Sequence, residues 1–396
     1  MSKILVDQIR SNSASSDAIT LADNGTCTAN ITNNLSNRNL IINGAMQVAQ
    51  RGTSSTSDGY KTIDRYYTSS SSNDESPTYS QVDVASGTTP YSLGFRKALR
   101  ITNGNQTSGA QAGSSATIYT PQEAQNIANS GWNYTSSSSN ITLSFWVKAS
   151  VSKTYYFYFK TPDGSAYLYP METGVLTADT WTKVTKTIPG NSNITINNDN
   201  GVGIEIMFWA YAGTNFTDAG VSLNTWQSYS GSARLPVDGT SWWTTNDATF
   251  EITGVQLEVG SVATDFEHRS FGQELALCQR YFYKTYDYAT APGTATFVGA
   301  QHGRNFDPNA ARSSVPICIN FPVRMRSVPT LTWYAGDGQS GKYSTGSTVG
   351  GTNLTTEKSV GTSIDKSETG IYHANFSEDV PATNLYAYQV TASAEL

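Results

Sequence analysis

The stretch Phe250-Glu-Ile-Thr-Gly-Val-Gln-Leu-Glu-Val-Gly260 alternates apolar and polar residues, but the alternation changes phase halfway along it. Phe250 and Ile252 occupy even positions, whereas the later apolar residues occupy odd positions. These later residues are Val255, Leu257 and Val259. Successive side chains of a β-strand point to opposite faces, so both sets can face one core only if an extra residue is inserted. The pattern predicts a strand with a β-bulge at Gly254.

The residues after this strand predict a short helix over 270–284. Ser270 can cap the helix, and Gln273 stands three residues later, where it completes a capping box. The apolar residues at spacings of four, seven and eleven lie on one helical face, and they are Phe271, Leu275, Cys278 and Phe282. Cys278 is therefore expected to be a buried apolar residue rather than a nucleophile. A strand followed by a capped helix marks a joint between two units of the chain.

The chain before this joint has the pattern of an all-β unit. Strands are expected at 141–149, 155–159, 181–188 and 204–210. Two of them, 155–159 and 204–210, are apolar on both faces, which suits a sandwich interior on one side and a subunit or ligand contact on the other. We therefore expect residues 38–269 to form an antiparallel jelly-roll sandwich.

The two ends of the chain predict smaller units. Residues 285–396 read as a second, C-terminal β domain, with strands at 315–321 and 330–333 and with loops or a weak hairpin over 335–363. A last strand over 385–396 indicates a C-terminus that is tied down. Residues 1–37 are too few to bury a core, so this segment is expected to attach to another protein or to start a trimer, with disorder as the alternative. Asn24-Gly25 within it predicts a tight turn.

Composition excludes several classes of function. The 396 residues allow two or three domains, and only 14% are charged, well below the roughly 25% of ordinary soluble domains. A net charge of −6 argues against a nucleic-acid partner, which would need clustered cations. No apolar run is as long as a membrane span, so no membrane insertion is expected. The surface must be rich in neutral hydroxyl and amide groups, as in carbohydrate-facing proteins and in many other soluble β proteins.

Motifs for catalysis, metals and cofactors are missing from the sequence. Cys27, Cys278 and Cys318 are too far apart for a disulfide framework or a zinc site, and the three histidines fall in no catalytic motif. Neither a cofactor nor a metal is expected. Two carboxylates that flank a sugar cannot be recognised from sequence. Glu205 and Glu251 lie on expected strands, where facing solvent is the favoured interpretation. We therefore expect no enzyme and no catalytic residues.

Aromatic residues before the joint give a candidate ligand surface. Glycan sites combine aromatic platforms, which stack on a sugar ring, with amide and carboxylate groups that bind its hydroxyls. The candidate residues are Trp226, Tyr229, Asp238, Trp242 and Trp243. Adjacent tryptophans in a turn are not expected to enter one core together, so at least one should be exposed or at a contact. Core packing and a subunit interface remain alternatives for this cluster.

Four sequence strings together resemble those of bacteriophage tail-fibre and minor virion proteins that carry a jelly roll similar to carbohydrate-binding modules. The strings are Asn39-Leu-Ile-Ile-Asn-Gly-Ala-Met-Gln-Val-Ala-Gln-Arg-Gly52, Asp64-Arg-Tyr66, Leu143-Ser-Phe-Trp-Val-Lys-Ala149 and the joint after residue 250. The resemblance covers roughly residues 38 to 290. It is looser beyond, where it rests on Phe321-Pro-Val-Arg-Met-Arg326 and on the last five residues.

This resemblance implies a virion protein made in the host cytoplasm and located in the phage tail. It would be a tail-fibre or receptor-binding component that attaches to the host cell surface through a glycan. It also implies a homotrimer, whose N-terminal segment would bind tail or baseplate proteins. Two alternatives are a structural decoration or adaptor protein without a receptor role, and a tail enzyme that degrades surface polysaccharide.

Overall fold

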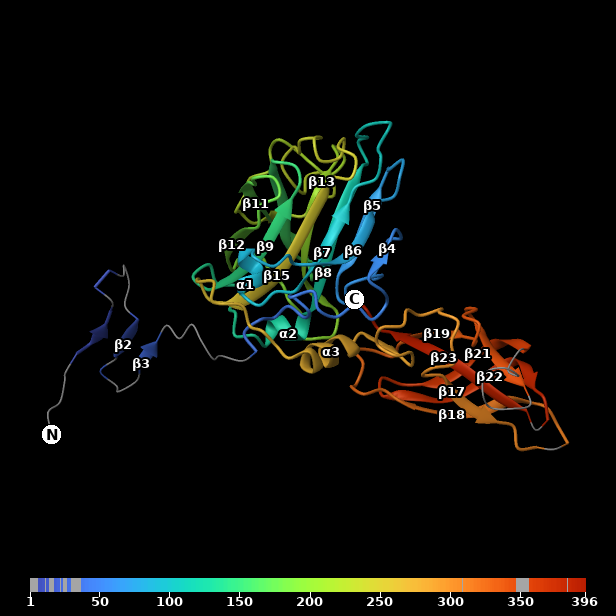
Figure 1. The fold of residues 1–396 in the computed structure, drawn as a ribbon. Helices are drawn as coiled ribbons and strands as arrows, with labels where there is room; N and C mark the ends of the chain where they lie inside the picture. Colours follow the sequence, from blue (N-terminus) through green and yellow to red (C-terminus); the bar gives the residue numbers. More distant parts are fainter. Residues whose placement is uncertain are drawn as a thin grey trace.

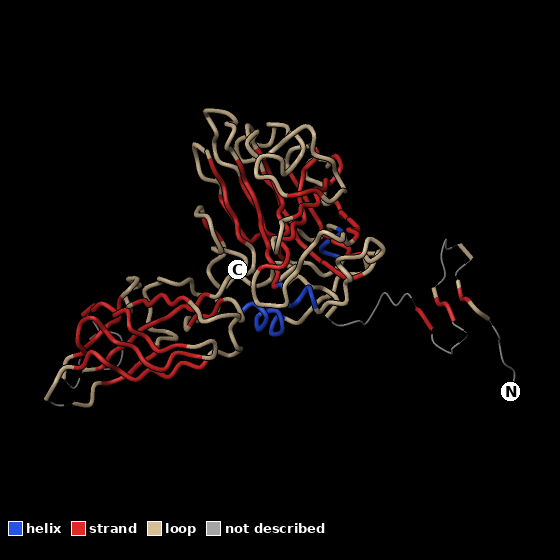
Figure 2. The backbone as a smooth tube through the Cα atoms, turned by 180° about the vertical axis from the view of Figure 1, so that it is seen from behind, coloured by secondary structure: helices blue, strands red, loops and turns tan. Residues whose placement is uncertain are grey.

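The computed structural model describes residues 6–10, 12–13, 18–21, 23, 27–29, 37–307, 309–346, 356–382 and 384–396. Within these residues the chain is mainly β, with short helices near the joint (Figures 1 and 2). Two antiparallel sheets face each other in the middle of the chain, and another antiparallel sheet follows toward the C-terminus. The expected fold class, a jelly-roll sandwich followed by a helix and a second β unit, is confirmed.

The sandwich consists of two six-stranded sheets. The first, the β13 sheet, has the order β14 (Gln227–Ser228), β11 (Tyr167–Val175), β10 (Thr154–Thr161), β13 (Val202–Ala212), β8 (Ser115–Glu123) and β5 (Tyr67–Ser71). The second, the β15 sheet, has the order β12 (Thr182–Pro189), β9 (Asn140–Ala149), β15 (Thr249–Val259), β7 (Lys97–Thr102), β6 (Thr78–Asp83) and β4 (Ser54–Ser55). Short helices α1 (Thr89–Ser92) and α2 (Ala124–Ala128) lie in the connections. The four strands expected here correspond to β9, β10, β12 and β13.

Aromatic side chains from both sheets fill the space between them. Phe145 of β9, Phe157 of β10 and Phe208 of β13 are each 1% exposed. The ring centroid of Phe145 lies 5.0 Å from that of Phe157 and 4.9 Å from that of Phe208, with the rings edge to face. Such ring contacts add to the free energy gained by removing apolar area from water. The inward-facing residues of the two sheets, every second residue along each strand, together form the core.

The bulge expected at Gly254 is confirmed. Along the pairing with β9, Thr253 faces Trp146 and the next pair is Gln256 with Ser144, so β15 contains one residue more than its partner over this interval. Gly254 has a φ of 63°, and a Cβ atom there would lie 2.7 Å from the ring of Phe95. Both requirements favour glycine.

The bulge brings the two apolar sets onto one face. Phe250, Ile252, Val255 and Leu257 all lie in the sandwich core. Val259 is the exception to the expected pattern, because its side chain is 41% exposed. It is the last residue of β15, where the strand leaves the covered part of the sheet.

The segment beginning at Asn39 replaces the neighbour that β15 loses at the bulge, since the pairing with β7 ends at Ile252. The Asn39 side chain donates to the Val255 carbonyl at 3.1 Å and accepts from the Leu257 amide at 3.0 Å. The Val255 amide donates to the Gly44 carbonyl at 2.9 Å. A Cβ atom at Gly44 would lie 2.0 Å from the Val255 carbonyl oxygen. Residues 39–44 of the resemblance string thus supply hydrogen bonds to β15 beyond its bulge, where β7 no longer pairs with it.

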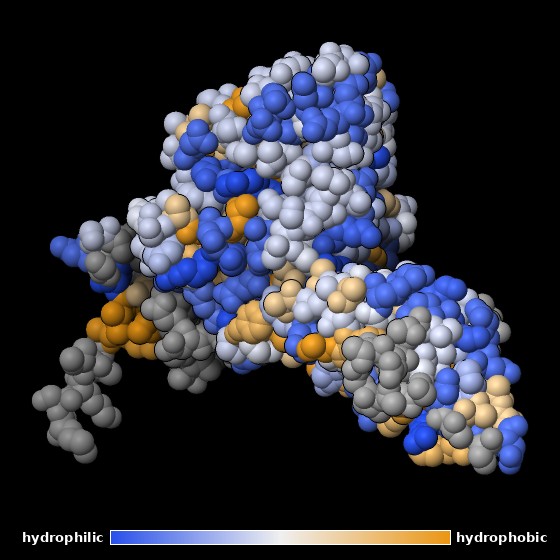
Figure 3. Space-filling view, turned by 45° about the vertical axis from the view of Figure 1, so that its right-hand side comes forward, coloured by the Kyte–Doolittle hydropathy of each residue, from blue (hydrophilic) through white to orange (hydrophobic). Residues whose placement is uncertain are grey.

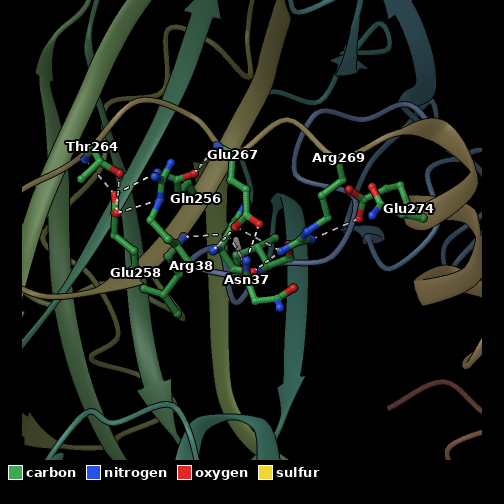
Figure 4. Close-up of polar contacts among 12 residues, drawn as sticks. Asn37, Arg38, Gln256, Glu258, Thr264, Glu267, Arg269 and Glu274 are labelled. Carbon is green, nitrogen blue, oxygen red and sulfur yellow. Dashed lines mark hydrogen bonds and ion pairs between the residues drawn. The ribbon is translucent and has the colours of Figure 1, made fainter. Parts of the chain in front are cut away.

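A polar network fixes the same segment to the residues that precede the helix (Figure 4). The Glu267 carboxylate accepts from the Asn37 amide at 2.5 Å and from the Asn39 amide at 2.7 Å. The Arg269 guanidinium donates to the carbonyls of Asn39 and Ile41 and lies 3.5 Å from the Glu274 carboxylate. The network connects residues 37–41 to residues 267–274 and thereby holds the joint.

Helix α3 (Phe271–Gln279) has the expected capping box. The Gln273 amide donates to the Ser270 hydroxyl at 3.4 Å, and the Ser270 amide donates to the Gln273 side chain at 3.1 Å. Cys278 is buried, as expected. Phe271 is instead 43% exposed and contacts the Tyr288 ring at 5.1 Å.

The expected end of the helix near Lys284 is wrong. The helix ends at Gln279, and Phe282–Lys284 form strand β16, which pairs with β23 (Leu385–Ser393). Helical periodicity continues through this segment, but the backbone of β23, far away in the sequence, offers it a sheet partner.

The C-terminal sheet has the order β16, β23, β20 (Lys342–Gly346), β21 (Thr356–Lys366), β22 (Gly370–Val380) and β18 (Arg312–Asn320). Strands β17 (Gln301–Arg304) and β19 (Thr330–Tyr334) also pair with β23. Loops or a weak hairpin were expected over 335–363, and the structure has the antiparallel pair β20–β21 there. The strands expected at 315–321 and 330–333 correspond to β18 and β19.

The C-terminus lies between the sandwich and this sheet (Figure 1). The Glu395 carboxylate pairs with the guanidinium groups of Arg51, at 2.9 Å, and Arg65, which is 0% exposed. Arg326 donates to the Ala394 carbonyl at 2.7 Å. The expected tied-down C-terminus is confirmed, and Arg65 of the 64–66 string is one of the residues that hold it.

The N-terminal segment contains a three-stranded sheet of β1 (Gln8–Ile9), β2 (Ile19–Leu21) and β3 (Cys27–Ala29). Ile9 is 49% exposed and Leu21 is 40% exposed, so these residues find no core of their own. The turn expected at Asn24-Gly25 lies outside the described residues. None of the helices in the described ranges is long and apolar enough to cross a membrane.

Candidate functional site

Trp242 and Trp243 are both completely buried, at 0% exposure. The indole N–H of Trp242 donates to the Thr249 carbonyl at 3.1 Å, and that of Trp243 donates to the Gly109 carbonyl at 3.2 Å. The expectation that at least one is exposed is wrong. The chain makes a helical turn here, with the Thr244 amide donating to the Thr240 carbonyl at 3.0 Å. Adjacent side chains in such a turn diverge by about 100°, so both can enter one core.

Asp238 is paired within the protein. Its carboxylate binds the Lys153 ammonium, and the two side chains are 4% and 10% exposed. The Ala212 amide donates to the same carboxylate at 3.2 Å. Burial raises the pKa of Asp238 and lowers that of Lys153, while their mutual attraction opposes both shifts. The pair fixes this loop to the sandwich, and its burial leaves the Asp238 carboxylate almost no surface for a sugar to contact.

Trp226 and Tyr229 are half-buried but occupy different places. The Trp226 indole donates to the Pro189 carbonyl at 2.7 Å, and its ring packs on Tyr169 at the margin of the core. Tyr229 lies on the outer face of the β13 sheet, where its ring centre is 4.5 Å from the Lys160 ammonium. The structure therefore does not gather the five predicted residues on one surface.

The outer face of the β13 sheet carries a row of tyrosines instead. Tyr67 of β5 is in register with Tyr119 of β8, and Tyr119 is in register with Met207 of β13. The Tyr60 ring lies 5.3 Å from that of Tyr67, which lies 6.3 Å from that of Tyr119. All three tyrosines are half-buried, so each keeps solvent-accessible surface. We call Tyr60, Tyr67 and Tyr119 the tyrosine strip.

A salt bridge lies beside the strip. Lys160 and Glu205 are in register on β10 and β13, with 2.9 Å between ammonium and carboxylate. Burial raises the pKa of the Tyr119 hydroxyl, and the nearby Glu205 carboxylate raises it further. The hydroxyl therefore stays protonated at neutral pH. The site combines aromatic faces with a phenolic donor, a carboxylate and an ammonium.

Other parts of the chain cover the two ends of this outer face. Residues 213–240 pack over one end, where Trp209, Leu235 and Phe216 join an apolar cluster. At the other end the Arg65 guanidinium donates to the Pro121 carbonyl at 2.8 Å, and the Tyr281 hydroxyl donates to Glu123 at 2.5 Å. The tyrosine strip lies between these covers, with Tyr60 bonded to the Leu396 carbonyl at 3.1 Å.

Glu205 and Glu251 were expected to face solvent, and this interpretation is wrong because both carboxylates are largely buried in ion pairs. Glu205 pairs with Lys160, and Glu251 is 2% exposed beside Arg100 at 2.9 Å and Lys148 at 3.2 Å. Glu205 belongs to the β13 sheet and Glu251 to the β15 sheet. Since both point away from the core between the sheets, they cannot flank one sugar as a glycosidase pair would.

Metal ligands do not cluster in the part of the chain that the structure describes, where no group of three His, Cys, Asp or Glu residues could hold an ion.

On the face drawn in Figure 3, the sandwich surface is mostly hydrophilic to neutral, with small scattered hydrophobic areas.

Sequence reasoning missed the tyrosine strip because Tyr67 and Tyr119 lie on strands that it did not identify. A signal was present in the strands that it did identify. Lys160 on one and Glu205 on the other mark the parity that faces outward, since both sit among apolar residues. Aromatic residues of that parity belong to the surface rather than to the core.

Comparisons with known proteins give only distant similarities. No protein-family model matches the chain, and no curated protein matches it. The enzymatically active domain of tailspike protein 4 from bacteriophage CBA120 is 11% identical, with a TM-score of 0.30, over 56% of this chain and 21% of that one. A putative sugar binding protein from Bacteroides thetaiotaomicron is 10% identical, with a TM-score of 0.31, over 56% and 100%.

A third similar structure is the N-terminal cellulose-binding domain of β-1,4-glucanase C from Cellulomonas fimi. It is 11% identical, with a TM-score of 0.26, over 55% of this chain and 99% of that one. This chain spans about a fifth of the length of the tailspike domain. At these scores the similarities carry no argument about function.

Proposed function

We propose that this protein is a non-enzymatic phage virion protein, a tail-fibre or receptor-binding component that attaches to a glycan of the host cell surface. The observation that carries the glycan role is the tyrosine strip beside the Lys160–Glu205 pair. A pyranose has an apolar face that stacks on aromatic rings and a rim of hydroxyls that needs donors and acceptors. The strip and the salt bridge supply both kinds of contact.

The virion role is supported by the sequence strings at 39–52, 64–66, 143–149 and after 250, which resemble those of tail-fibre and minor virion proteins. The N-terminal sheet would then bind tail or baseplate proteins or join copies of the chain in a homotrimer. Ile9 and Leu21 are the exposed apolar residues that such a contact would cover. The protein would act in the phage tail after synthesis in the host cytoplasm.

Glycan-array binding followed by calorimetry tests the proposal. The full chain should bind at least one surface glycan, and Tyr119→Ala should weaken that binding about tenfold, because an aromatic platform contributes roughly 1 kcal/mol or more. Tyr372→Ala is the matched control, since Tyr372 is an exposed tyrosine of the C-terminal sheet, at 45% exposure. It should bind as the unaltered protein does.

Three results would contradict parts of this proposal. Unchanged affinity in Tyr119→Ala would remove the strip as the site. No glycan binding, together with binding to virion proteins, would favour a decoration or adaptor protein. Release of sugars from host envelope polysaccharide would favour a tail enzyme.

A further inference from the structure

Arg234 lies at the covered end of the outer face, among aromatic rings. Its guanidinium carbon is 5.1 Å from the ring centre of Phe216, 5.7 Å from that of Tyr229 and 5.9 Å from that of Trp209. Its Nε donates to the Gly231 carbonyl at 3.0 Å. Arginine has five N–H donors in a rigid fork, and this bond uses only one of them.

No carboxylate of the described residues pairs with Arg234 within 4.0 Å. Arg65 has Glu395 and Arg280 has Glu123 as such partners. The half-buried Arg326 also lacks a carboxylate, but it donates to the carbonyls of Asn200, Ala394 and Glu395. The Tyr158 hydroxyl contacts the Arg234 guanidinium, but a phenol is neutral and leaves the charge unmatched. This half-buried cation therefore lacks the counter-charge that the fork geometry suits.

Two cations and one carboxylate lie around Tyr229, which leaves one positive charge without a partner. Lys160 lies 4.5 Å from the Tyr229 ring, and Glu205 neutralises it at 2.9 Å. Arg234 adds a second cation on the same ring with no acid to match it. The excess is local, because the whole chain has a net charge of −6.

A second donor at this end also lacks a partner. The indole N–H of Trp209 is buried and makes no hydrogen bond, although unpaired buried donors are rare in folded proteins. Trp209 and Arg234 are neighbours, as their 5.9 Å separation shows. The Trp209 N–H is closed off from solvent, so the half-buried Arg234 is the group that a ligand can reach, and as a donor it favours a ligand that brings acceptor oxygens.

We infer that the glycan bound at the tyrosine strip is acidic, with a sugar carboxylate, as in uronic or sialic acids, paired with Arg234. This inference rests on the proposed glycan-binding function. Tyr158, which contacts Arg234, lies two strands from Tyr119 along one register row, a distance of roughly 10 Å. One oligosaccharide can span that distance, stacking on the strip while its carboxylate reaches the guanidinium.

The test uses matched acidic and neutral probes with the full chain. The probes are hexagalacturonate, oligomannuronate, a hyaluronan hexasaccharide and an oligosialic acid, each beside its carboxyl-reduced, neutral form. The protein should bind at least one acidic probe at least about tenfold more tightly than its neutral form, because reduction of the carboxylate removes the charge-assisted bond to Arg234. Arg234→Gln should lose about tenfold to a hundredfold in affinity for that probe only.

The control variant is Arg96→Gln. Arg96 is another arginine over a tyrosine, 3.9 Å from the Tyr91 ring, and it donates to the Tyr91 carbonyl of α1 and to the Phe95 carbonyl in the connection from α1 to β7, away from the β13 sheet. It should bind both probe forms normally. Thermal unfolding of each variant separates a binding defect from a folding defect.

Each other outcome decides against the inference. Equal affinity for acidic and neutral forms would overturn it and leave the proposed glycan function standing. A loss of both forms in Arg234→Gln, together with a lower melting temperature, would make Arg234 a structural residue of the covering segment. Failure to bind any probe here and any glycan on an array would remove both the inference and the proposed function.

Discussion

Two groups of aromatic residues in the sandwich differ in how their polar atoms are used. Trp242 and Trp243 are fully buried, and each indole N–H is bonded to a backbone carbonyl. Tyr67 and Tyr119 are half-buried on an outer sheet face, beside an ion pair. The more conspicuous pair in the sequence packs the core, whereas the less conspicuous pair keeps solvent-accessible ring surface and belongs to the proposed glycan site. An indole N–H is a single donor, so one that is already bonded inside the protein cannot also bind a ligand.

The largest expected effect comes from removing an interior ring. Trp243→Ala should lower the free energy of unfolding by about 3–5 kcal/mol, because it leaves a cavity in the core. Chemical denaturation followed by circular dichroism measures this, with Trp243→Phe as a milder control. If Trp243→Ala kept its stability and lost glycan binding, the roles of the two groups would be reversed.

Removing a ring from the tyrosine strip should weaken glycan binding and change the free energy of unfolding little, the reverse of the effect expected for Trp243. Tyr67→Ala should weaken glycan binding about tenfold, since it removes one platform, while unfolding changes by only about 1 kcal/mol. Calorimetric titration and a denaturation curve on the same sample give both values. A large loss of stability with unchanged affinity would place Tyr67 with the interior pair.

Trp226 is half-buried at the margin of the core, so it tests where the core ends and the proposed ligand surface begins. Trp226→Phe keeps a ring against Tyr169 but removes the donor to the Pro189 carbonyl, so unfolding should become easier by about 1 kcal/mol. Glycan affinity should not change. A selective loss of affinity would extend the ligand surface to this edge of the sheet.

The smallest effect is expected at acid pH, where the outer face meets the C-terminal unit. Burial disfavours the Glu123 charge, but hydrogen bonds from Arg280 and Tyr281 outweigh it and hold the pKa of Glu123 below its ordinary value of 4.5. A carboxylate with a lowered pKa stabilises the fold above its ordinary pKa, and this contribution is lost as pH falls through the folded value.

Melting temperatures of the unaltered protein and Glu123→Gln test this. The gap between them should be widest near neutral pH and should shrink as pH falls below about 4.5, because glutamine cannot titrate. Glycan affinity at neutral pH should be the same in both. A gap that does not vary with pH would show that Glu123 contributes no charge-dependent stability.

Much of the fold followed from local sequence. The phase change at Gly254 predicted the bulge, and Ser270 with Gln273 predicted the start of the helix. The helix end was wrong because β23, about 100 residues further along, pairs with Phe282–Lys284. No local pattern encodes a partner at that distance.

The candidate site was less accessible to sequence reasoning for a related reason. The tyrosine strip exists only through the register of β5, β8 and β13, which come from separate parts of the chain. The tryptophan pair was misjudged because adjacent side chains of a turn were expected to point too far apart to share a core, whereas in the observed helical turn they diverge by about 100° and both are buried. On strand β13, which was identified, Glu205 was expected to point away from the core, and it does so, paired with Lys160 of β10.

The bulge in β15 also bears on which changes in chain length the protein can tolerate. Deleting Gly254 would restore simple pairing with β9, yet it would turn either Phe250 and Ile252 or Val255 and Leu257 out of the core. A single insertion elsewhere in the strand would do the same. Homologous chains should therefore vary in length within 213–240 and keep a fixed residue count from Thr249 to Val259, whatever side chains they exchange there.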